Sequence, residues 1–214
     1  MVRAVIFDLD GLLLDSEVYW EEARREYCLS AGCDWRAKDE LGVKGYNSPE
    51  WAQAIRSHCG LTVEPAGIIG AVTDRMRGLY EKDLPLLPGA VDVVRRVARE
   101  YPIAVASSSP PQLIEFVTTR AGIRECFQAL VSADTVGRGK PAPDVFLAAA
   151  EDLATPPAEI AVFEDSTAGI LAGRAAGMRV IAVPNPHYPP APDALARADV
   201  VLGSLLEFRP DMLI

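Results

Sequence analysis

The feature that most constrains the fold is a series of short apolar runs that occur together with helical patterns along the chain. Each run is continuous rather than alternating in polarity, as expected for parallel strands that are covered on both faces. The runs lie at residues 4–7, 103–106, 129–131, 160–163, 180–183 and 200–202. Helical patterns accompany the later runs, at residues 90–100, 110–121, 144–152 and 167–176. This order predicts an α/β fold with a doubly wound parallel sheet.

The segment from residue 15 to residue 82 interrupts the alternation. It contains three or four amphipathic helical patterns and no convincing strand, with patterns at residues 16–31 and about 66–81. Another helix is predicted to start at Ser48-Pro49, since serine caps helices and proline fits the first helical position. A block this long exceeds an ordinary connection between a strand and a helix. We therefore predict a Rossmann-like core of residues 1–14 and 83–214 with an inserted all-helical cap domain of residues 15–82.

The composition limits the kinds of partner. Half of the 214 residues are apolar, so the chain can bury a core. The formal net charge of -9 argues against nucleic acid or an anionic membrane as a partner. The chain shows neither the apolar run of a membrane helix nor a basic N-terminus followed by an apolar stretch. We expect a soluble, cytoplasmic protein, either a monomer or a weak homodimer.

The cysteines and histidines show no recognisable constellation. The four cysteines form no C-x-x-C pair, and no histidine stands at metal-ligand spacing from them. We therefore expect reduced, mostly buried thiols. The cysteines are Cys28, Cys33, Cys59 and Cys126. Neither His58 nor His187 is a credible base, so we assign proton transfer to carboxylates.

Acidic or hydroxyl side chains follow three of the predicted strands. In open α/β sheets, ligands bind outside the carboxyl ends of the strands. The residues at these ends are Asp8 and Asp10, then Ser107, Ser108 and Ser109, then Glu164 and Asp165. Lys140 lies in a Gly-Lys-Pro loop before the helix that leads to the fourth strand. We interpret Ser109 as a helix cap, because Pro110 and Gln112 follow it as in a capping box.

The acids raise a question of charge. Four carboxylates in one crevice would carry about -4, and Lys140 would reduce this only to about -3, which is costly in a poorly solvated cleft. A divalent cation offsets the cost, and Mg²⁺ suits carboxylates, a backbone carbonyl, waters and a phosphate oxygen. Asp8 and Asp10 are two residues apart, so both side chains can face one substrate. One could attack phosphorus, while the other protonates the leaving oxygen and then activates a water.

Four motifs follow one another along the chain, FDLDGLLLDSE, VASSS, GKPAPDVF and FEDSTAGILAGRAAGM. In type and order they resemble the haloacid dehalogenase-like (HAD) hydrolase superfamily, specifically its beta-phosphoglucomutase-like phosphatase branch. The resemblance implies that a helical cap opens and closes on residues 11–14, although Gly11 could also simply turn the chain. It implies a small phosphorylated metabolite as the partner and Mg²⁺ as the cofactor.

The resemblance also implies a role for each matching residue. Asp8 would be the phosphorylated nucleophile and Asp10 the general acid and base. Lys140 would act with them by bridging nucleophile and phosphate. The phosphate-binding residues would be Ser107, Ser108 and Lys140. The Mg²⁺ ligands would be Asp8, Asp10, Glu164 and Asp165, with Asp10 contributing its backbone carbonyl.

Within the family, the residues favour phosphatase chemistry. Dehalogenases of the superfamily lack the second aspartate, which is present here as Asp10. Phosphonate-cleaving relatives need a cap lysine, and neither Lys38 nor Lys44 has a matching context. We therefore predict a Mg²⁺-dependent phosphatase that hydrolyses small phosphomonoesters, with a sugar phosphate as the expected substrate, through an aspartyl-phosphate.

Two alternatives stay open. The first is a beta-phosphoglucomutase-type mutase, although Trp20 stands where the mutases carry a cap histidine and Lys44 replaces a cap arginine. The second is a phosphoacceptor signalling module, although such modules carry their acceptor aspartate in mid-chain and lack a helical insert. Candidates for contact with the non-phosphate end of the substrate are Glu17, Trp20, Lys44, Tyr46 and Asn47. Trp20 and Tyr46 also suit burial between cap helices.

Overall fold

The core of the protein is a six-stranded sheet with strand order β3-β2-β1-β4-β5-β6. A computed structural model describes residues 1–43 and 46–213. The strands are β1 Ala4–Phe7, β2 Ile103–Ser107, β3 Ala129–Ser132, β4 Ile160–Glu164, β5 Arg179–Ala182 and β6 Val200–Val201. Every neighbouring pair is parallel. The order reverses beside β1, so the predicted doubly wound α/β sheet is confirmed.

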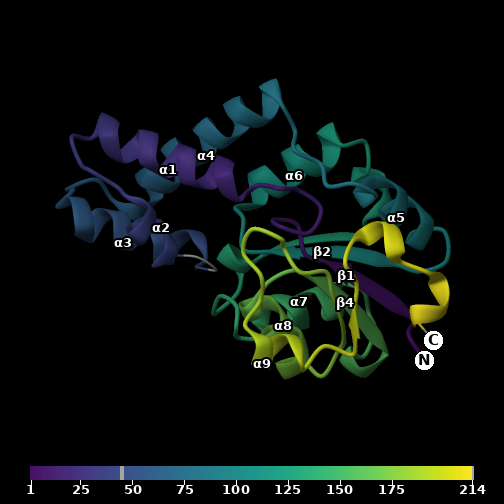
Figure 1. The fold of residues 1–214 in the computed structure, drawn as a ribbon. Helices are drawn as coiled ribbons and strands as arrows, with labels where there is room; N and C mark the ends of the chain where they lie inside the picture. The colour runs from purple at the N-terminus through teal and green to yellow at the C-terminus, as the bar shows by residue number, and fades with distance from the viewer. Residues whose placement is uncertain (44–45, 214) are drawn as a thin grey trace.

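The central strands are buried on both faces, which explains why they appear in the sequence as continuous apolar runs. All residues of β1, β2 and β4 are buried. Val5 and Phe7 pack into one hydrophobic cluster, and Ala4 and Ile6 pack into the other. One face of the sheet is covered by α5 Ala90–Val97 and α6 Pro111–Arg120 (Figure 1). The other face is covered by α7 Asp144–Asp152 and α8 Thr167–Ala175, and α9 Pro192–Leu195 lies beside α8.

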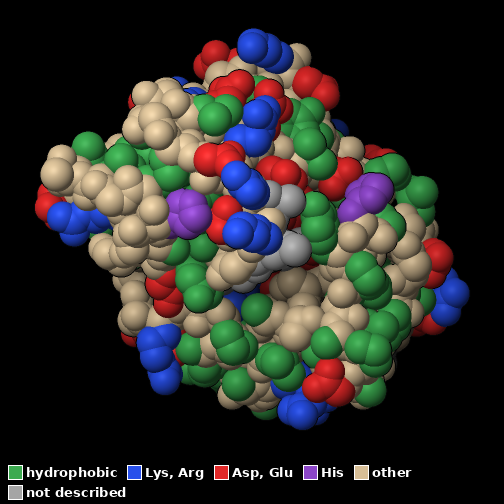
Figure 2. Space-filling view, turned by 60° about the vertical axis from the view of Figure 1, so that its left-hand side comes forward, with side chains coloured by type: hydrophobic (Ala, Val, Ile, Leu, Met, Phe, Trp, Pro, Cys, Tyr) green, Lys and Arg blue, Asp and Glu red, His purple; other side chains and the backbone are tan. Residues whose placement is uncertain are grey.

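A helical insertion separates β1 from α5, as predicted. Its helices are α1 Glu17–Ser30, α2 Ala37–Leu41, α3 Ser48–Cys59 and α4 Pro65–Lys82. They form a separate lobe at one end of the sheet (Figure 1). The proposed limits of residues 15 and 82 enclose all of these helices. On the face at the cap end of the molecule, acidic and basic side chains are interspersed (Figure 2).

The start of α3 differs by one residue from the expectation. Asn47, rather than Ser48, is the N-cap residue. The side-chain oxygen of Asn47 accepts a hydrogen bond from the backbone N–H of Glu50 (3.1 Å), and the Glu50 carboxylate accepts one from the N–H of Asn47 (2.9 Å). This reciprocal pair satisfies two N–H groups that the first turn of a helix leaves free. Ser48 is therefore the first helical residue.

The expectation of reduced cysteines is wrong for two of them. Cys33 and Cys59 form a disulfide with a Cα–Cα distance of 5.5 Å. Cys33 lies just beyond α1 and Cys59 is the last residue of α3, so the bond joins two cap helices. The residues are 26 positions apart, and no local spacing indicates such a pair. Cys28 and Cys126 are free thiols.

Among the described residues, no helix combines the length and the apolar character that a membrane span requires.

Candidate active site

The predicted site residues of the core converge at the carboxyl ends of β1, β2 and β4. A cavity of about 560 Å³ lies there between the sheet and the helical insertion. Its lining from the core includes Asp8, Asp10, Ser107, Ser108, Ser109, Lys140 and Asp165. Its lining from the insertion is Glu17, Trp20, Arg24, Tyr46 and Trp51. The cavity is therefore enclosed by side chains from both parts of the chain.

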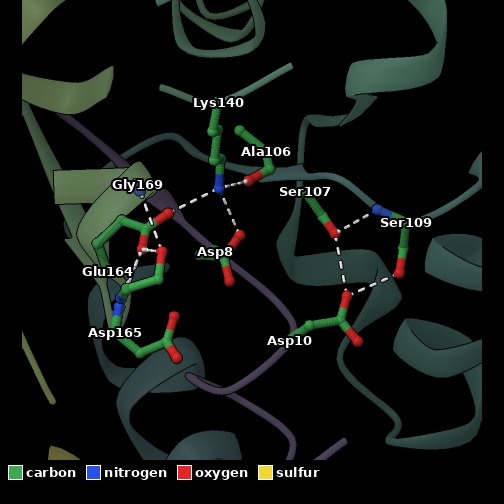
Figure 3. A network of polar contacts seen from close by, with 10 residues as sticks. Asp8, Asp10, Ala106, Ser107, Ser109, Lys140, Glu164, Asp165 and Gly169 are labelled. Atoms are coloured by element: carbon green, nitrogen blue, oxygen red, sulfur yellow. Dashed lines mark hydrogen bonds and ion pairs between the residues drawn. The ribbon is translucent and has the colours of Figure 1, made fainter. Parts of the chain in front are cut away.

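Lys140 connects two of the acids (Figure 3). Its Nζ lies 2.6 Å from Oδ1 of Asp8 and 2.7 Å from Oε1 of Glu164, and it donates to the carbonyl of Ala106 at 3.1 Å. All three charged groups are buried. Burial by itself would lower the pKa of Lys140, but the two carboxylates outweigh this and raise that pKa above its usual range. Lys140 is therefore held as a cation.

The acidic charge in this cluster exceeds the charge of the lysine. Burial raises the pKa of Asp8, and the neighbouring Glu164 adds to the rise while Lys140 opposes it. Burial also raises the pKa of Asp165 well above its usual value, with further contributions from Glu164 and Asp8. These rises are the expected cost of crowding carboxylates in a poorly solvated site. The cluster is therefore short of positive charge.

The surplus charge and the donor set fit a divalent cation. Asp8, Glu164 and Asp165 each offer a carboxylate oxygen, and these oxygens lie within 4.8 Å of one another. Oxygen ligands of this kind are what Mg²⁺ binds. Two backbone hydrogen bonds orient the carboxylate of Glu164, because its Oε2 accepts hydrogen bonds from the N–H groups of Asp165 (3.0 Å) and Ser166 (3.1 Å). The side chain of Asp10 is not part of this group, so its metal role through the backbone carbonyl stays a prediction.

Two glycines make room for the acids. A Cβ atom added to Gly169 would lie 1.7 Å from Cδ of Glu164, and one added to Gly11 would lie 2.1 Å from Oδ2 of Asp165. Gly11 also has a φ of 84°, a conformation that other residues rarely adopt. Both positions therefore require glycine because a carboxylate of the cluster occupies the space of a side chain.

Asp10 has different partners from Asp8. Its Oδ2 accepts hydrogen bonds from the hydroxyls of Ser109 (2.7 Å) and Ser107 (3.2 Å), as Figure 3 shows. Its Oδ1 accepts from the indole Nε1 of Trp20 at 2.9 Å. Trp20 belongs to α1 of the insertion, so one carboxylate oxygen is bound from the core and the other from the cap. The cap is therefore packed on the core in this structure.

The interpretation of Ser109 as a helix cap is wrong. Helix α6 begins at Pro111 with Pro110 as its N-cap, and no side chain caps it. The residue before a proline avoids the helical region, and Pro110 is extended with a ψ of 144°. The second proline therefore moves the helix start beyond Ser109. Instead, the hydroxyl of Ser109 donates to Asp10, and its carbonyl accepts from the hydroxyl of Ser132 at 2.6 Å.

The candidates in the cap have different positions. Glu17, Trp20 and Tyr46 line the cavity. Asn47 is not among the lining residues, and its side-chain oxygen caps α3. Lys44 lies outside the described residues.

Sequence reasoning missed several residues of the cavity. They are Arg24, Trp51 and Tyr188, while Ser109 was identified but interpreted as a helix cap. Arg24 follows Trp20 by four positions, which places both on one face of α1. That spacing could have indicated Arg24. Tyr188 lies in a proline-rich loop after β5, where no pattern marks it.

The chain was compared with known families and proteins. The family model of the haloacid dehalogenase-like hydrolases matches residues 2–177. The bifunctional riboflavin kinase/FMN phosphatase of Arabidopsis thaliana is 34% identical over 207 residues, which is 96% of this chain but only 54% of that protein. Hexitol phosphatase B of Escherichia coli K12 is 34% identical over 218 residues, which cover 96% of this chain and 94% of that protein.

The fold is also similar to solved structures. CbbY from Rhodobacter sphaeroides, crystallised in complex with phosphate, superposes with a TM-score of 0.85 and 29% identity. The match covers 97% of this chain and 96% of that chain. On these matches and the geometry of the site, the protein belongs to the haloacid dehalogenase-like hydrolases and is a phosphatase, a phosphoric monoester hydrolase, of that family.

Proposed function

We propose that the protein hydrolyses the phosphomonoester of a small metabolite, with a sugar phosphate as the expected class, through an aspartyl-phosphate at Asp8. The observation that supports this best is the pairing of Asp8 with the buried Lys140, beside a second aspartate with separate partners. A carboxylate at the floor of a cavity, next to a cation, is suited to attack an anionic phosphoryl group. The name of hexitol phosphatase B supports a sugar-type substrate.

In the first step, an oxygen of the Asp8 carboxylate forms a bond to phosphorus while the bond from phosphorus to the ester oxygen breaks. Asp10, in its protonated form, gives a proton to the ester oxygen, and the alcohol leaves. Lys140 offsets charge on the attacking group and on the phosphoryl oxygens. The products of this step are the free alcohol, phosphorylated Asp8 and an ionised Asp10.

In the second step, water replaces the alcohol. Asp10 accepts a proton from the water, whose oxygen forms a bond to phosphorus while the bond to Asp8 breaks. Inorganic phosphate leaves, Asp8 is restored as a carboxylate, and Asp10 is protonated again. One residue can serve both steps because the base of the second step is the acid of the first. The hydroxyls of Ser107 and Ser109 support Asp10 throughout.

Asp8, Glu164 and Asp165 would hold Mg²⁺ at this site. When bound, the ion would offset the negative charge of the transferring phosphoryl group. Trp20 contributes from the cap, because its N–H reaches Asp10 when cap and core are packed together. Closure of this kind keeps water out until the substrate is in place.

The test is a panel of phosphomonoesters that includes sugar phosphates and p-nitrophenyl phosphate, assayed for phosphate release with Mg²⁺ and with excess EDTA. We expect repeated turnover with Mg²⁺ and little with EDTA. A mutase would interconvert sugar phosphate isomers and release little phosphate, and a signalling module would form a long-lived phosphoprotein with negligible turnover. Either result, or no reaction with any ester, contradicts the proposal.

A further inference from the structure

Asp134 is an acid of the core that the proposed chemistry does not use, and its side chain binds the cap. It lies in the 3-10 helix Ala133–Thr135 directly after β3 and is half-buried. Its Oδ1 accepts a hydrogen bond from the backbone N–H of Ser48 at 2.8 Å, although the two residues are 86 positions apart. Ser48 is fully buried and is the first residue of α3. The contact is therefore a buried junction between the two parts of the chain.

The first turn of α3 leaves one backbone donor for the core. A helix begins with N–H groups that have no acceptor within the helix. The side-chain oxygen of Asn47 accepts from the N–H of Glu50, and Pro49 has no N–H to donate. The N–H of Ser48 is the donor that remains, and Asp134 supplies its acceptor. A carboxylate is also the group that the positive end of a helix dipole favours. Asp134 therefore completes the N-terminus of a cap helix from outside the cap.

Asp134 is also linked to Asp10 through a series of hydrogen bonds within the core. Its backbone N–H donates to the hydroxyl of Ser132 at 3.1 Å. That hydroxyl donates to the carbonyl of Ser109 at 2.6 Å, and the hydroxyl of Ser109 donates to Oδ2 of Asp10 at 2.7 Å. Ser109 and Ser132 are each 2% exposed, so little water can compete for these bonds. The series therefore connects the place where α3 docks with the proposed acid and base.

A second set of contacts leads from α3 to the other oxygen of Asp10. Trp51 lies three residues after Ser48 in the same helix, and its ring centre is 6.1 Å from that of Trp20. The indole N–H of Trp20 donates to Oδ1 of Asp10 at 2.9 Å. Trp20 and Trp51 both line the cavity. Both carboxylate oxygens of Asp10 are therefore held by groups whose positions depend on α3 lying against the core.

We propose that Asp134 is a positioning residue for the reaction, which docks α3 on the core and so places Asp10 for proton transfer to the leaving group. The inference rests on the proposed function and adds a residue that does not itself line the cavity. When the cap moves away, the N–H of Ser48 leaves the Asp134 carboxylate, and the support of Asp10 weakens at both oxygens. Asp10 is therefore in place only when the cap is closed.

The test compares two kinds of ester that differ in their need for an acid. p-Nitrophenolate leaves phosphorus without a proton and an alkoxide does not, so only an alkyl ester depends on Asp10 in the first step. The measured quantity is kcat/KM for the alkyl phosphate that the wild-type protein hydrolyses best in the panel, divided by kcat/KM for p-nitrophenyl phosphate. Both values include binding and the first step, but not hydrolysis of the aspartyl-phosphate. Partial unfolding of a sample lowers both values equally and leaves their ratio unchanged.

Four variants separate the contacts. Asp134→Ala removes the acceptor of the Ser48 N–H, and we expect it to lower the ratio about 10-fold, as for the loss of a hydrogen bond to a charged group. Ser132→Ala breaks the series between Asp134 and Asp10 and should lower the ratio about 5-fold or more. Asp134→Asn keeps an oxygen for the Ser48 N–H and should stay within about threefold of the wild type. Asp152→Ala removes an exposed acid at the end of α7 and is the matched control, with an unchanged ratio.

Quenching of tryptophan fluorescence by acrylamide measures docking of the cap without catalysis. The chain has three tryptophans, Trp20, Trp35 and Trp51, and all lie in the insertion with at most 6% of their surfaces exposed. Because Trp20 and Trp51 line the cavity, opening of the cap exposes them to the quencher. We expect the quenching constant to rise in Asp134→Ala and to stay near the wild-type value in Asp134→Asn.

Three results would overturn the inference. The first is a ratio that is unchanged in Asp134→Ala or Ser132→Ala, or equally lowered in Asp152→Ala. The second is a ratio in Asp134→Asn as low as that in Asp134→Ala. The third is a quenching constant of Asp134→Ala equal to that of the wild type. In all three cases the wild-type protein still releases phosphate, so the proposed function survives. Failure of the wild type to hydrolyse any alkyl ester of the panel contradicts the proposed function itself.

Discussion

Asp8 and Asp10 are the same residue type two positions apart, yet their surroundings differ. Asp8 is buried against Lys140 and two further acids, Glu164 and Asp165. Asp10 receives hydrogen bonds from two serine hydroxyls and from the indole of Trp20. These different partners support the proposed roles of Asp8 as nucleophile and Asp10 as proton carrier, which residue type alone does not distinguish.

The contact between Trp20 and Asp10 leads to a prediction about catalysis. Trp20→Phe keeps an aromatic ring against Trp51 and Arg24 but removes the N–H that binds Oδ1 of Asp10. We expect kcat to fall about 10-fold, because the loss of a hydrogen bond to a charged group costs about 1.5 to 3 kcal/mol. KM should change much less. Steady-state kinetics on one good substrate measures both.

Trp20→His is the companion variant for that experiment. It restores a ring N–H at a smaller size, so it should recover part of the lost kcat if the hydrogen bond matters. If Trp20→Phe instead retains kcat within twofold of the wild type, Trp20 does not position Asp10, and its role is packing alone.

The core residues of the cavity could be predicted from local motifs, and the cap residues only in part, since Glu17, Trp20 and Tyr46 line the cavity but Arg24 and Trp51 were missed. Asp8, Lys140 and Glu164 follow strands or precede a helix in recognisable motifs, so local sequence marks them. Arg24 lines the cavity because α1 of the cap lies near the carboxyl end of β1, where Trp20 reaches Asp10, and Tyr188 lines it from the loop after β5. Such positions depend on how distant segments dock, which a local pattern does not record.

At the scale of elements, the strands were predicted well for one physical reason. Burial on both faces makes the central strands largely apolar, and β1 occupies the predicted residues 4–7. The first residues of the helices were predicted less accurately than the strands, because several consecutive residues can each act as an N-cap. Asn47 caps α3 where Ser48 was expected, and Pro111 displaces the start of α6 beyond Ser109. In both helices, the residue next to the expected N-cap determines where the helix begins.

The disulfide between α1 and α3 has a consequence for the stability of the cap. It closes a loop of 26 residues, and a loop of that length stabilises the folded state by about 3 kcal/mol, mainly by restricting the unfolded chain. Dithiothreitol should therefore lower the denaturant midpoint of the wild-type protein. Urea unfolding with and without the reductant measures the change.

Cys59→Ser provides the control for this prediction. It lacks the bond from the start, so its midpoint should be low and should not respond to dithiothreitol. Alkylation of the unreduced wild-type protein after unfolding, followed by mass spectrometry, should modify only the two free thiols, Cys28 and Cys126. Four alkylated cysteines in unreduced, unfolded protein would contradict the disulfide.

At the scale of the whole molecule, the order of the strands determines where the site lies. The sheet reverses direction beside β1, and acids from β1 and β4 meet at that point. The cap is inserted directly after β1, so its first helix starts near the carboxyl end of that strand and extends away from the sheet (Figure 1). In the proposed mechanism, the core supplies the groups for phosphoryl transfer, and the cap supplies the walls that would meet the leaving group.

Several polar contacts hold the cap and the core together. The backbone N–H of Ser48, at the start of α3, donates to Oδ1 of Asp134 in the core at 2.8 Å. The bond from Trp20 to Asp10 and those from Arg120 of α6 to the carbonyls of Tyr80 (3.0 Å) and Glu81 (2.7 Å) also join cap and core, so the polar contacts lie both beside the reacting atoms and away from them. The structure is therefore in a closed form, in which the groups that we assign to catalysis line one cavity with residues of the cap.

The central claim is that Asp8 carries out the chemistry of a phosphatase, and the most direct test is phosphate release by Asp8→Asn. The amide is nearly the same size as the carboxylate but is a poor nucleophile. We predict that the wild-type protein with Mg²⁺ turns over at least one phosphomonoester repeatedly. Asp8→Asn should be at least about 1,000-fold slower, with a melting temperature no lower than that of the wild type, because burial of charge at this site is unfavourable. Turnover by Asp8→Asn at the wild-type rate would contradict the account.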